Sequence, residues 1–249
     1  MSTVESVFKF YLLCNKLKNV IRTGWKNWNV KRDRIESVAE HIYSVQMLAI
    51  AMKSEFNYDV DIYKVIYMLA IHELGETVIG DITLFDMDRK DKERMEHEAV
   101  HQILKGLLDG DKIEELFLEF DAHQTKEAKF AYMCDKLECD LQAVVYDLEK
   151  CVDLNDQANN SSFLDEKVQK LLKNGYSFGE MWLKFGQERY SYDENFMAVS
   201  KFAMKYLHNY LNPDDEKYLS EYKTEVINEV EKELSDIGPS LIKKKEIGE

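Results

Sequence analysis

The 249-residue sequence contains only two prolines, Pro213 and Pro239, and both lie near its end. Long helices can therefore run without the residue that disrupts them most. No stretch approaches the ~20 apolar residues that a membrane span needs, so we expect no membrane-embedded segment. The N-terminal sequence MSTVESVFKF lacks the basic start and the small-residue cleavage site of a signal peptide, which favours a cytoplasmic protein.

Paired cysteines and excess positive charge are also absent. The four cysteines form no CxxC motif and show no disulfide spacing, so buried free thiols in a reducing cytoplasm explain them. The formal net charge is −14. A nucleic-acid polymer is therefore not expected as a partner, because neutralising its phosphates needs a basic surface. A single nucleotide stays compatible, since a bound metal can supply local positive charge.

Apolar residues recur at helical spacing along most of the chain, and 32% of the residues are charged. This combination predicts an all-α protein. The C-terminal part is expected either to pack on the first half or to form a subunit contact, and the second arrangement would make the protein a homodimer. Helices are predicted at 4–21, 38–52, from 61 through the stretch below, 92–108, 127–150, 163–174, 178–190, 193–211 and 214–236.

The most informative stretch is 71–81, which reads IHELGETVIGD. On a helix that continues the preceding apolar stripe, His72 and Glu76 both face the core, one turn apart. Either residue alone is explained by a structural role. Together with Glu73 and Asp81 they place four polar side chains in eleven positions, and such a group favours a functional site because buried carboxylates need partners.

Other segments contribute candidate partners. Ser37 and Glu40 form a capping box, which predicts a helix start with His41 on its buried stripe. Asp135 flanks the core stripe of the helix at 127–150, where a boundary salt bridge is the simpler explanation. The basic segment 26–35 is either an anion-binding loop or an ordinary surface loop.

A formal match to the zinc-protease pattern HExxH occurs between His97 and His101. That pattern belongs on a helix buried against the active site and is followed by a third ligand. Here the preceding residues, Lys92 to Glu96, are almost all charged and describe a solvated face. We therefore do not expect a zinc protease.

Two histidines and two or three acids on three core helices match the needs of one divalent ion. Mixed imidazole and carboxylate ligands suit Mn, Fe, Co, Ni or Zn, and incomplete protein ligation leaves positions for water and a substrate oxygen.

Several segments, taken in order, resemble the HD-domain superfamily of metal-dependent phosphohydrolases, and within it the 5′-deoxynucleotidase group. These segments are RTGW at 22–25, ESVAEH at 36–41, the stretch from His72 to Asp81, EAKF at 127–130 and DKLE at 135–138. The resemblance covers roughly residues 5–150. It implies an all-α helical bundle with additional C-terminal helices: one HD-type domain over 1–249, with its core at 1–155 and a helical extension at 156–249.

The resemblance also implies roles for individual residues. The implied metal ligands are His41, His72, Glu73 and Asp135. Glu76 and Asp81 are implied near the attacking water and the leaving sugar oxygen, Arg22 at the phosphate, and Trp25 on the sugar, where its bulk can exclude a 2′-hydroxyl. The chief departure is Glu73, because the family has aspartate at this position.

The expected activity is hydrolysis of deoxynucleoside 5′-monophosphates to deoxynucleoside and phosphate. Glu76 would position or deprotonate the water. Two alternatives are an HD phosphohydrolase acting on a cyclic or polyphosphorylated nucleotide and a non-catalytic HD-like protein that binds a nucleotide.

Overall fold

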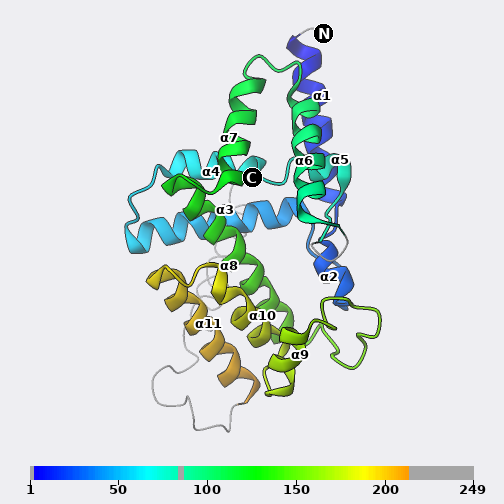
Figure 1. The fold of residues 1–249 in the computed structure, drawn as a ribbon, viewed down its shortest axis with the longest axis vertical. Coiled ribbons are helices and arrows are strands. Elements are labelled where there is room, and N and C mark those ends of the chain that lie inside the picture. Colours follow the sequence, from blue (N-terminus) through cyan, green and yellow to red (C-terminus); the bar gives the residue numbers. More distant parts are fainter. Residues whose placement is uncertain (1–2, 84–86, 213–249) are drawn as a thin grey trace, which may run out of the picture. The chain divides into compact units, whose positions relative to one another are not determined.

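Figure 1 shows a computed structural model of the chain, which describes residues 3–83 and 87–212. The chain divides into two units, Met1–Met204 and Lys205–Glu249. All contacts discussed below lie within the first unit. The described residues of this unit contain helices and isolated bridges but no strand, which confirms the predicted all-α class. The predicted helix at 214–236 lies outside the described residues.

The N-terminal part, up to residue 83, is helical over most of its length. Its elements are α1 (Thr3–Asn15), the 3₁₀ helix η1 (Lys16–Asn19), α2 (Thr23–Asn27), α3 (Val38–Phe56), α4 (Ile62–Ile71) and α5 (Glu76–Ile79). The predicted capping box is present, because Ser37 accepts from the Glu40 amide while the Glu40 carboxylate accepts from the Ser37 amide. It begins α3 at Val38, and His41 lies fully buried in the first turn of that helix.

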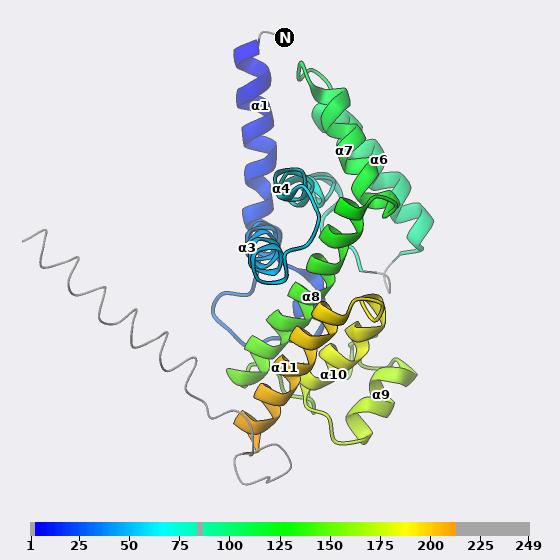
Figure 2. The ribbon, with the colours of Figure 1, turned by 90° about the vertical axis from the view of Figure 1, so that its left-hand side faces the viewer.

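The later helices are α6 (Arg89–Leu104), α7 (Gly110–Ala122), α8 (Lys126–Leu148), α9 (Glu166–Lys173), α10 (Phe178–Gly186), η2 (Gln187–Arg189) and α11 (Glu194–Leu211). Within the first unit α8 is the central helix, since it contacts α3, α4, α7 and α10. α6 and α7 lie side by side in Figure 2. The main core forms where α3, α4 and α8 meet, and includes Val45, Met68, Phe130 and Leu137.

Besides α7, for which no helix was predicted, two segments differ from the sequence prediction. The expected apolar face of the first helix is mostly exposed, with Val7, Phe8 and Tyr11 each more than half accessible. The helix at 62–71 also does not continue through Glu76. It ends at Ile71, and the turn that follows is closed by i→i+3 bonds, from Leu74 N–H to Ile71 O and from Glu76 N–H to Glu73 O. His72 and Glu76 are buried all the same.

Candidate metal centre

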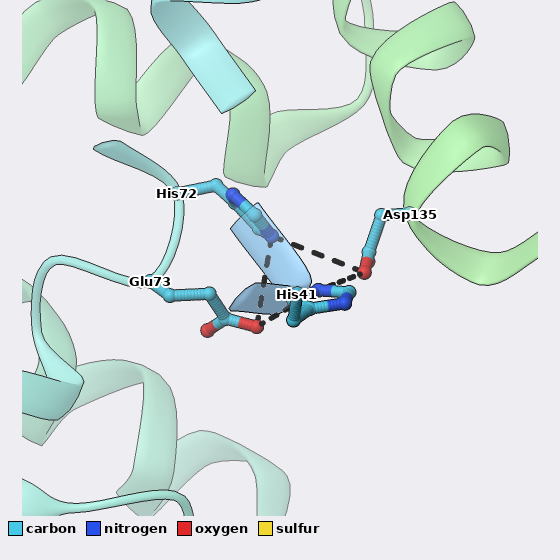
Figure 3. A group of neighbouring side chains, drawn as sticks. All are labelled: His41, His72, Glu73 and Asp135. Atoms are coloured by element: carbon cyan, nitrogen blue, oxygen red, sulfur yellow. Dashed lines mark ion pairs between the residues drawn. The ribbon is translucent and has the colours of Figure 1, made fainter. Parts of the chain in front are cut away.

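The four side chains implied as metal ligands meet at one place (Figure 3). His41 comes from α3, His72 and Glu73 from the turn after α4, and Asp135 from α8, and their ligand atoms all lie within 4.8 Å of one another. His41 Nε2 is 3.2 Å from Asp135 Oδ1 and 3.8 Å from Glu73 Oε1. His72 Nε2 is 3.6 Å from Glu73 Oε1 and 3.9 Å from Asp135 Oδ1.

This spacing fits a metal ion. Donors that each lie ~2.1 Å from one ion are roughly 3–3.5 Å apart, close to the separations found here. His41 Nε2, His72 Nε2 and Asp135 Oδ1 are buried, and none has a hydrogen-bond partner among the described residues. Buried polar atoms normally have partners. Three that converge without one are the signature expected of residues that share a cation.

The two imidazoles are oriented for this role by their other ring nitrogens. His41 Nδ1–H donates to Glu138 Oε2 at 2.6 Å, and His72 Nδ1–H donates to the Leu69 carbonyl at 2.8 Å. Both bonds fix the tautomer that leaves Nε2 as a lone-pair donor. Bonds of this kind raise ligand basicity and set the orientation of the ring.

The carboxylates of the cluster are held ionised. Burial opposes ionisation of Glu73, but His72 and Arg22 lower its pKa to about 2. Burial also opposes ionisation of Asp135, whose pKa Lys136 and His41 hold well below its usual value. A charged oxygen from each residue is therefore ready to bind a cation.

Arg22 lies against Glu73 rather than in open solvent. Its Nη1 donates to Glu73 Oε1 at 3.1 Å, and its Nη2 donates to Cys139 Sγ at 3.3 Å. The guanidinium thus anchors the Glu73 carboxylate. The predicted contact of Arg22 with phosphate stays a prediction.

Glu76 lies close to Glu73 and so next to the cluster, and Asp81 lies close to Glu76. Glu76 is 1% exposed, and neither of its carboxylate oxygens has a hydrogen-bond partner among the described residues. Burial and the nearby carboxylate of Glu73 raise the pKa of Glu76 well above its usual value. Gly80, with φ of +75°, ends α5 in a conformation that favours glycine. The turn brings Asp81 Oδ2 to the Thr23 amide at 2.5 Å.

Trp25 is placed in the core. Its ring is 2% exposed and packs on Tyr146 and Trp182, with centroids 5.3 and 5.1 Å away. Its indole N–H donates to Glu36 Oε2 at 2.6 Å. The predicted contact of this ring with a sugar remains a prediction, and the ring does not line the cavity described next.

A cavity of about 740 Å³ opens at the cluster. His72, Glu73 and Asp135 line one part of it. The remaining lining residues are charged or aromatic side chains, most of them not singled out from the sequence: Arg89, Lys92, Glu93, Glu96, Phe117, Phe120, Asp121, His123, Lys129, Tyr132, Lys136, Arg189 and Tyr192. One signal was present in the sequence, because Lys129, Tyr132 and Lys136 recur at i, i+3 and i+7 beside Asp135 and so share a helix face.

The two HExxH histidines are not part of this cluster, because each is paired with an acidic residue of α7. His97 Nε2 is paired with Asp121 at 2.6 Å and His101 Nδ1 with Glu114 at 3.0 Å, which ties α6 to α7. Neither histidine belongs to a metal-capable group found among the described residues. Both histidines thus have side-chain partners on α7, and the absence of a zinc-protease site stays a prediction.

Comparison with known proteins identifies the family. A family model described as the HD domain matches residues 14–182. The chain belongs to the HD-domain family. The human 5′-deoxynucleotidase HDDC2 is 36% identical over 151 residues, which cover 58% of this chain and 71% of the human protein. The 5′-deoxynucleotidase HDDC2 of Dictyostelium discoideum is 32% identical over 152 residues, covering 58% of this chain and 79% of the relative.

The fold has been seen before. A solved structure from Magnetospirillum magnetotacticum MS-1, described as a predicted metal-dependent phosphohydrolase, superposes with a TM-score of 0.58. It is 20% identical and covers 84% of this chain and 97% of its own, and at this identity the likeness concerns the fold alone. Among the described helices of the HD-family chain, none has the length and apolar character needed to span a bilayer.

Proposed function

We propose that this chain is a metal-dependent phosphomonoesterase that hydrolyses deoxynucleoside 5′-monophosphates to the deoxynucleoside and phosphate. The observation that carries the proposal is the convergence of His41, His72, Glu73 and Asp135 at a cavity of about 740 Å³, a size typical of small-ligand sites. The 5′-deoxynucleotidases to which the chain is similar support this substrate class. No observation favours a cyclic or polyphosphorylated nucleotide, or a non-catalytic role.

The charge of the cavity suits a phosphate monoester. Five carboxylates and five cationic side chains line it, so the lining alone is close to neutral. A divalent ion at the cluster would leave the cavity with a net positive charge. That charge matches the phosphate dianion in magnitude, because electrostatic complementarity favours ligands of opposite sign.

The clustered residues and Glu76 have different proposed roles in catalysis. His41, His72, Glu73 and Asp135 would hold one divalent transition metal, proposed as Mn, Fe, Co, Ni or Zn from the mixed imidazole and carboxylate donors. Bound there, such an ion would lower the pKa of water and polarise a phosphoryl oxygen. Glu76, whose carboxylate oxygens have no hydrogen-bond partner among the described residues, would take the proton from the attacking water. Lys92 Nζ lies 3.8 Å from Glu76 Oε1 and opposes, in part, the rise that burial causes in the pKa of Glu76, and a carboxylate of raised pKa is a stronger base.

The test of the substrate is phosphate release from a panel of nucleotides by the metal-loaded protein. Deoxynucleoside 5′-monophosphates should be hydrolysed faster than the matching ribonucleotides. A pocket rejects an added hydroxyl only modestly, by up to about 10²-fold, so the preference need not be absolute. Equal rates on dAMP and AMP would remove the deoxynucleotide assignment. Rapid hydrolysis of a cyclic or polyphosphorylated nucleotide alone would replace it.

The proposal extends to where the protein acts and how it assembles. A small-molecule substrate and the sequence features above fit a cytoplasmic enzyme. A homodimer is supported by the exposed apolar side chains along α1, namely Val4, Val7, Phe8 and Tyr11, which a second copy would cover. Light scattering should then give twice the mass of one chain, and replacing Phe8 with lysine should lower it.

A further inference from the structure

The cavity has an aromatic part next to its metal-binding part. The ring of Phe120 lies 5.2 Å from the ring of His72, the ring of His123 lies 5.6 Å from that of Phe120, and the ring of Tyr132 lies 4.1 Å from that of His123. These four side chains all line the cavity. A series of rings therefore leads from a metal-ligand candidate to Tyr132.

Tyr132 is placed to meet a ligand. It precedes Asp135 by three residues on α8, so the two side chains are neighbours on one helix face. The ring of Phe120 is buried in the core, whereas Tyr132 is half-buried. Lys136 Nζ lies 5.2 Å from the centroid of the Tyr132 ring and adds positive charge beside it.

A second tyrosine lines the same cavity from a different part of the chain. Tyr192 lies in the turn between η2 and α11, beyond the residues 14–182 that match the family model. It is 65% exposed. A large aromatic side chain that lines a cavity and stays accessible offers a surface on which a second ring can stack.

We infer that Tyr132 and Tyr192 form the binding site for the nucleobase. This inference rests on the proposed function and extends it. A nucleoside monophosphate has an anionic end and an aromatic end separated by a sugar, and the cavity offers the metal cluster and a tyrosine one helical turn away. Stacking tolerates every base, because each base has a π-face. The site therefore selects a nucleotide over a sugar phosphate without selecting one base.

The experiment compares two substrates that share a phosphate and a sugar. They are dAMP and 2-deoxyribose 5-phosphate, which lacks the base, tested with the metal-loaded full-length protein. Tyr132→Ala should lower kcat/KM for dAMP by about tenfold or more, the scale of one lost base–aromatic stack. It should leave kcat/KM for 2-deoxyribose 5-phosphate unchanged. Tyr132→Phe keeps the ring and should behave like the parent.

Equilibrium dialysis with 2′-deoxyadenosine gives a readout that does not depend on turnover. Tyr132→Ala and Tyr192→Ala should each weaken its binding, while Tyr63→Ala, which alters an exposed tyrosine on α4 outside the cavity, should not. Equal losses on both substrates, or unchanged nucleoside binding in both cavity variants, would overturn the inference. A different result would overturn the proposed function and not this inference: the parent protein hydrolyses neither substrate, but Tyr132→Ala and Tyr192→Ala still weaken nucleoside binding.

Discussion

Glu73 shows at the scale of one residue how this chain departs from its family resemblance and compensates. The side chain carries one methylene more than the implied aspartate, and ordering its extra rotatable bond costs conformational entropy. The same oxygen that faces the two histidines accepts a hydrogen bond from Arg22. Arg22 thereby restricts the longer side chain to the position where a ligand is needed.

Substitution of Glu73 tests whether this oxygen is a metal ligand. Glu73→Gln should weaken metal binding by about tenfold or more, since it removes one charged partner at nearly constant shape. Glu73→Asp should keep or raise metal affinity. Calorimetric metal titration of the three proteins measures both effects. If the glutamine variant binds metal like the parent, Glu73 is not a ligand.

Glu138 provides a second test at this scale, because it bonds the Nδ1 atom of His41 and is not one of the four clustered side chains. Glu138→Gln keeps a carbonyl oxygen that can accept from Nδ1–H but removes the charge that strengthens the imidazole as a donor. Metal affinity should fall by about 10–100-fold, the usual effect of losing such a partner. Competition with a metal-binding dye measures this loss. The matched control is Glu115→Gln on the exposed side of α7, which should leave metal affinity unchanged.

At the scale of elements, the sequence predicted most helices for clear physical reasons. The capping box located the start of α3, and the apolar stripe located α8 within one or two residues. α7 was missed, although Ile113, Leu116, Phe117 and Phe120 carry a helical repeat. The charged residues between them conceal that repeat. Because α7 was not predicted, Phe117 and Phe120 were not recognised as residues that line the cavity.

Two further features depend on contacts that local sequence cannot show. One is the exposure of the apolar side chains of α1. A periodic apolar stripe predicts that these side chains share one helix face, but it does not predict which element packs on that face. The break between α4 and α5 is the other. There Gly75 lies against the backbone of Glu96 on α6, where a Cβ would sit 3.2 Å from the Glu96 Cα. The four side chains of the cluster were predictable because they occur in motifs, whereas the residues that line the cavity are scattered over several elements.

A buried polar network joins α8 to the elements that follow α10. Tyr190 O–H donates to Asp140 Oδ2 at 2.7 Å and lies 3.1 Å from Ser200 Oγ. Gly186 leaves room for the Asp140 carboxylate, since a Cβ there would clash with it. Burial raises the pKa of Asp140 to about 8. The carboxyl is therefore protonated in the folded chain at pH values where it ionises in the unfolded chain.

The stability of this network should depend on pH. Between pH ~4, near the pKa of an exposed aspartate, and pH 8, the folded state holds a proton that the unfolded state has lost. This contribution to stability is full at low pH and is lost as the pH rises toward 8. Asp140→Asn cannot ionise, so its melting temperature relative to the parent should increase steadily from pH 5 to pH 8. A difference that stays constant over this range would show that Asp140 titrates normally.

At the scale of the whole molecule, the fold brings together residues that are distant in sequence. The cluster draws on α3, the turn after α4 and α8, and the cavity adds side chains from α6, α7 and the segment before α11. The helices α3 and α8 fix His41 and Asp135, and His72 is held at the C-terminal end of α4 by its bond to the Leu69 carbonyl, as catalytic geometry requires. Residues outside the family-matched segment, Arg189 and Tyr192, also line the cavity.

The central claim is that these convergent side chains bind a divalent ion that the reaction requires. Its most direct test is phosphate release from dAMP by chelator-treated protein before and after a divalent metal is restored, with bound metal measured in parallel. Activity should vanish on chelation and return with metal. His72→Ala should lose both metal and activity, while His97→Ala, which breaks only the pair with Asp121, should keep both. Full activity after chelation, or metal retained by His72→Ala and lost by His97→Ala, would contradict the account.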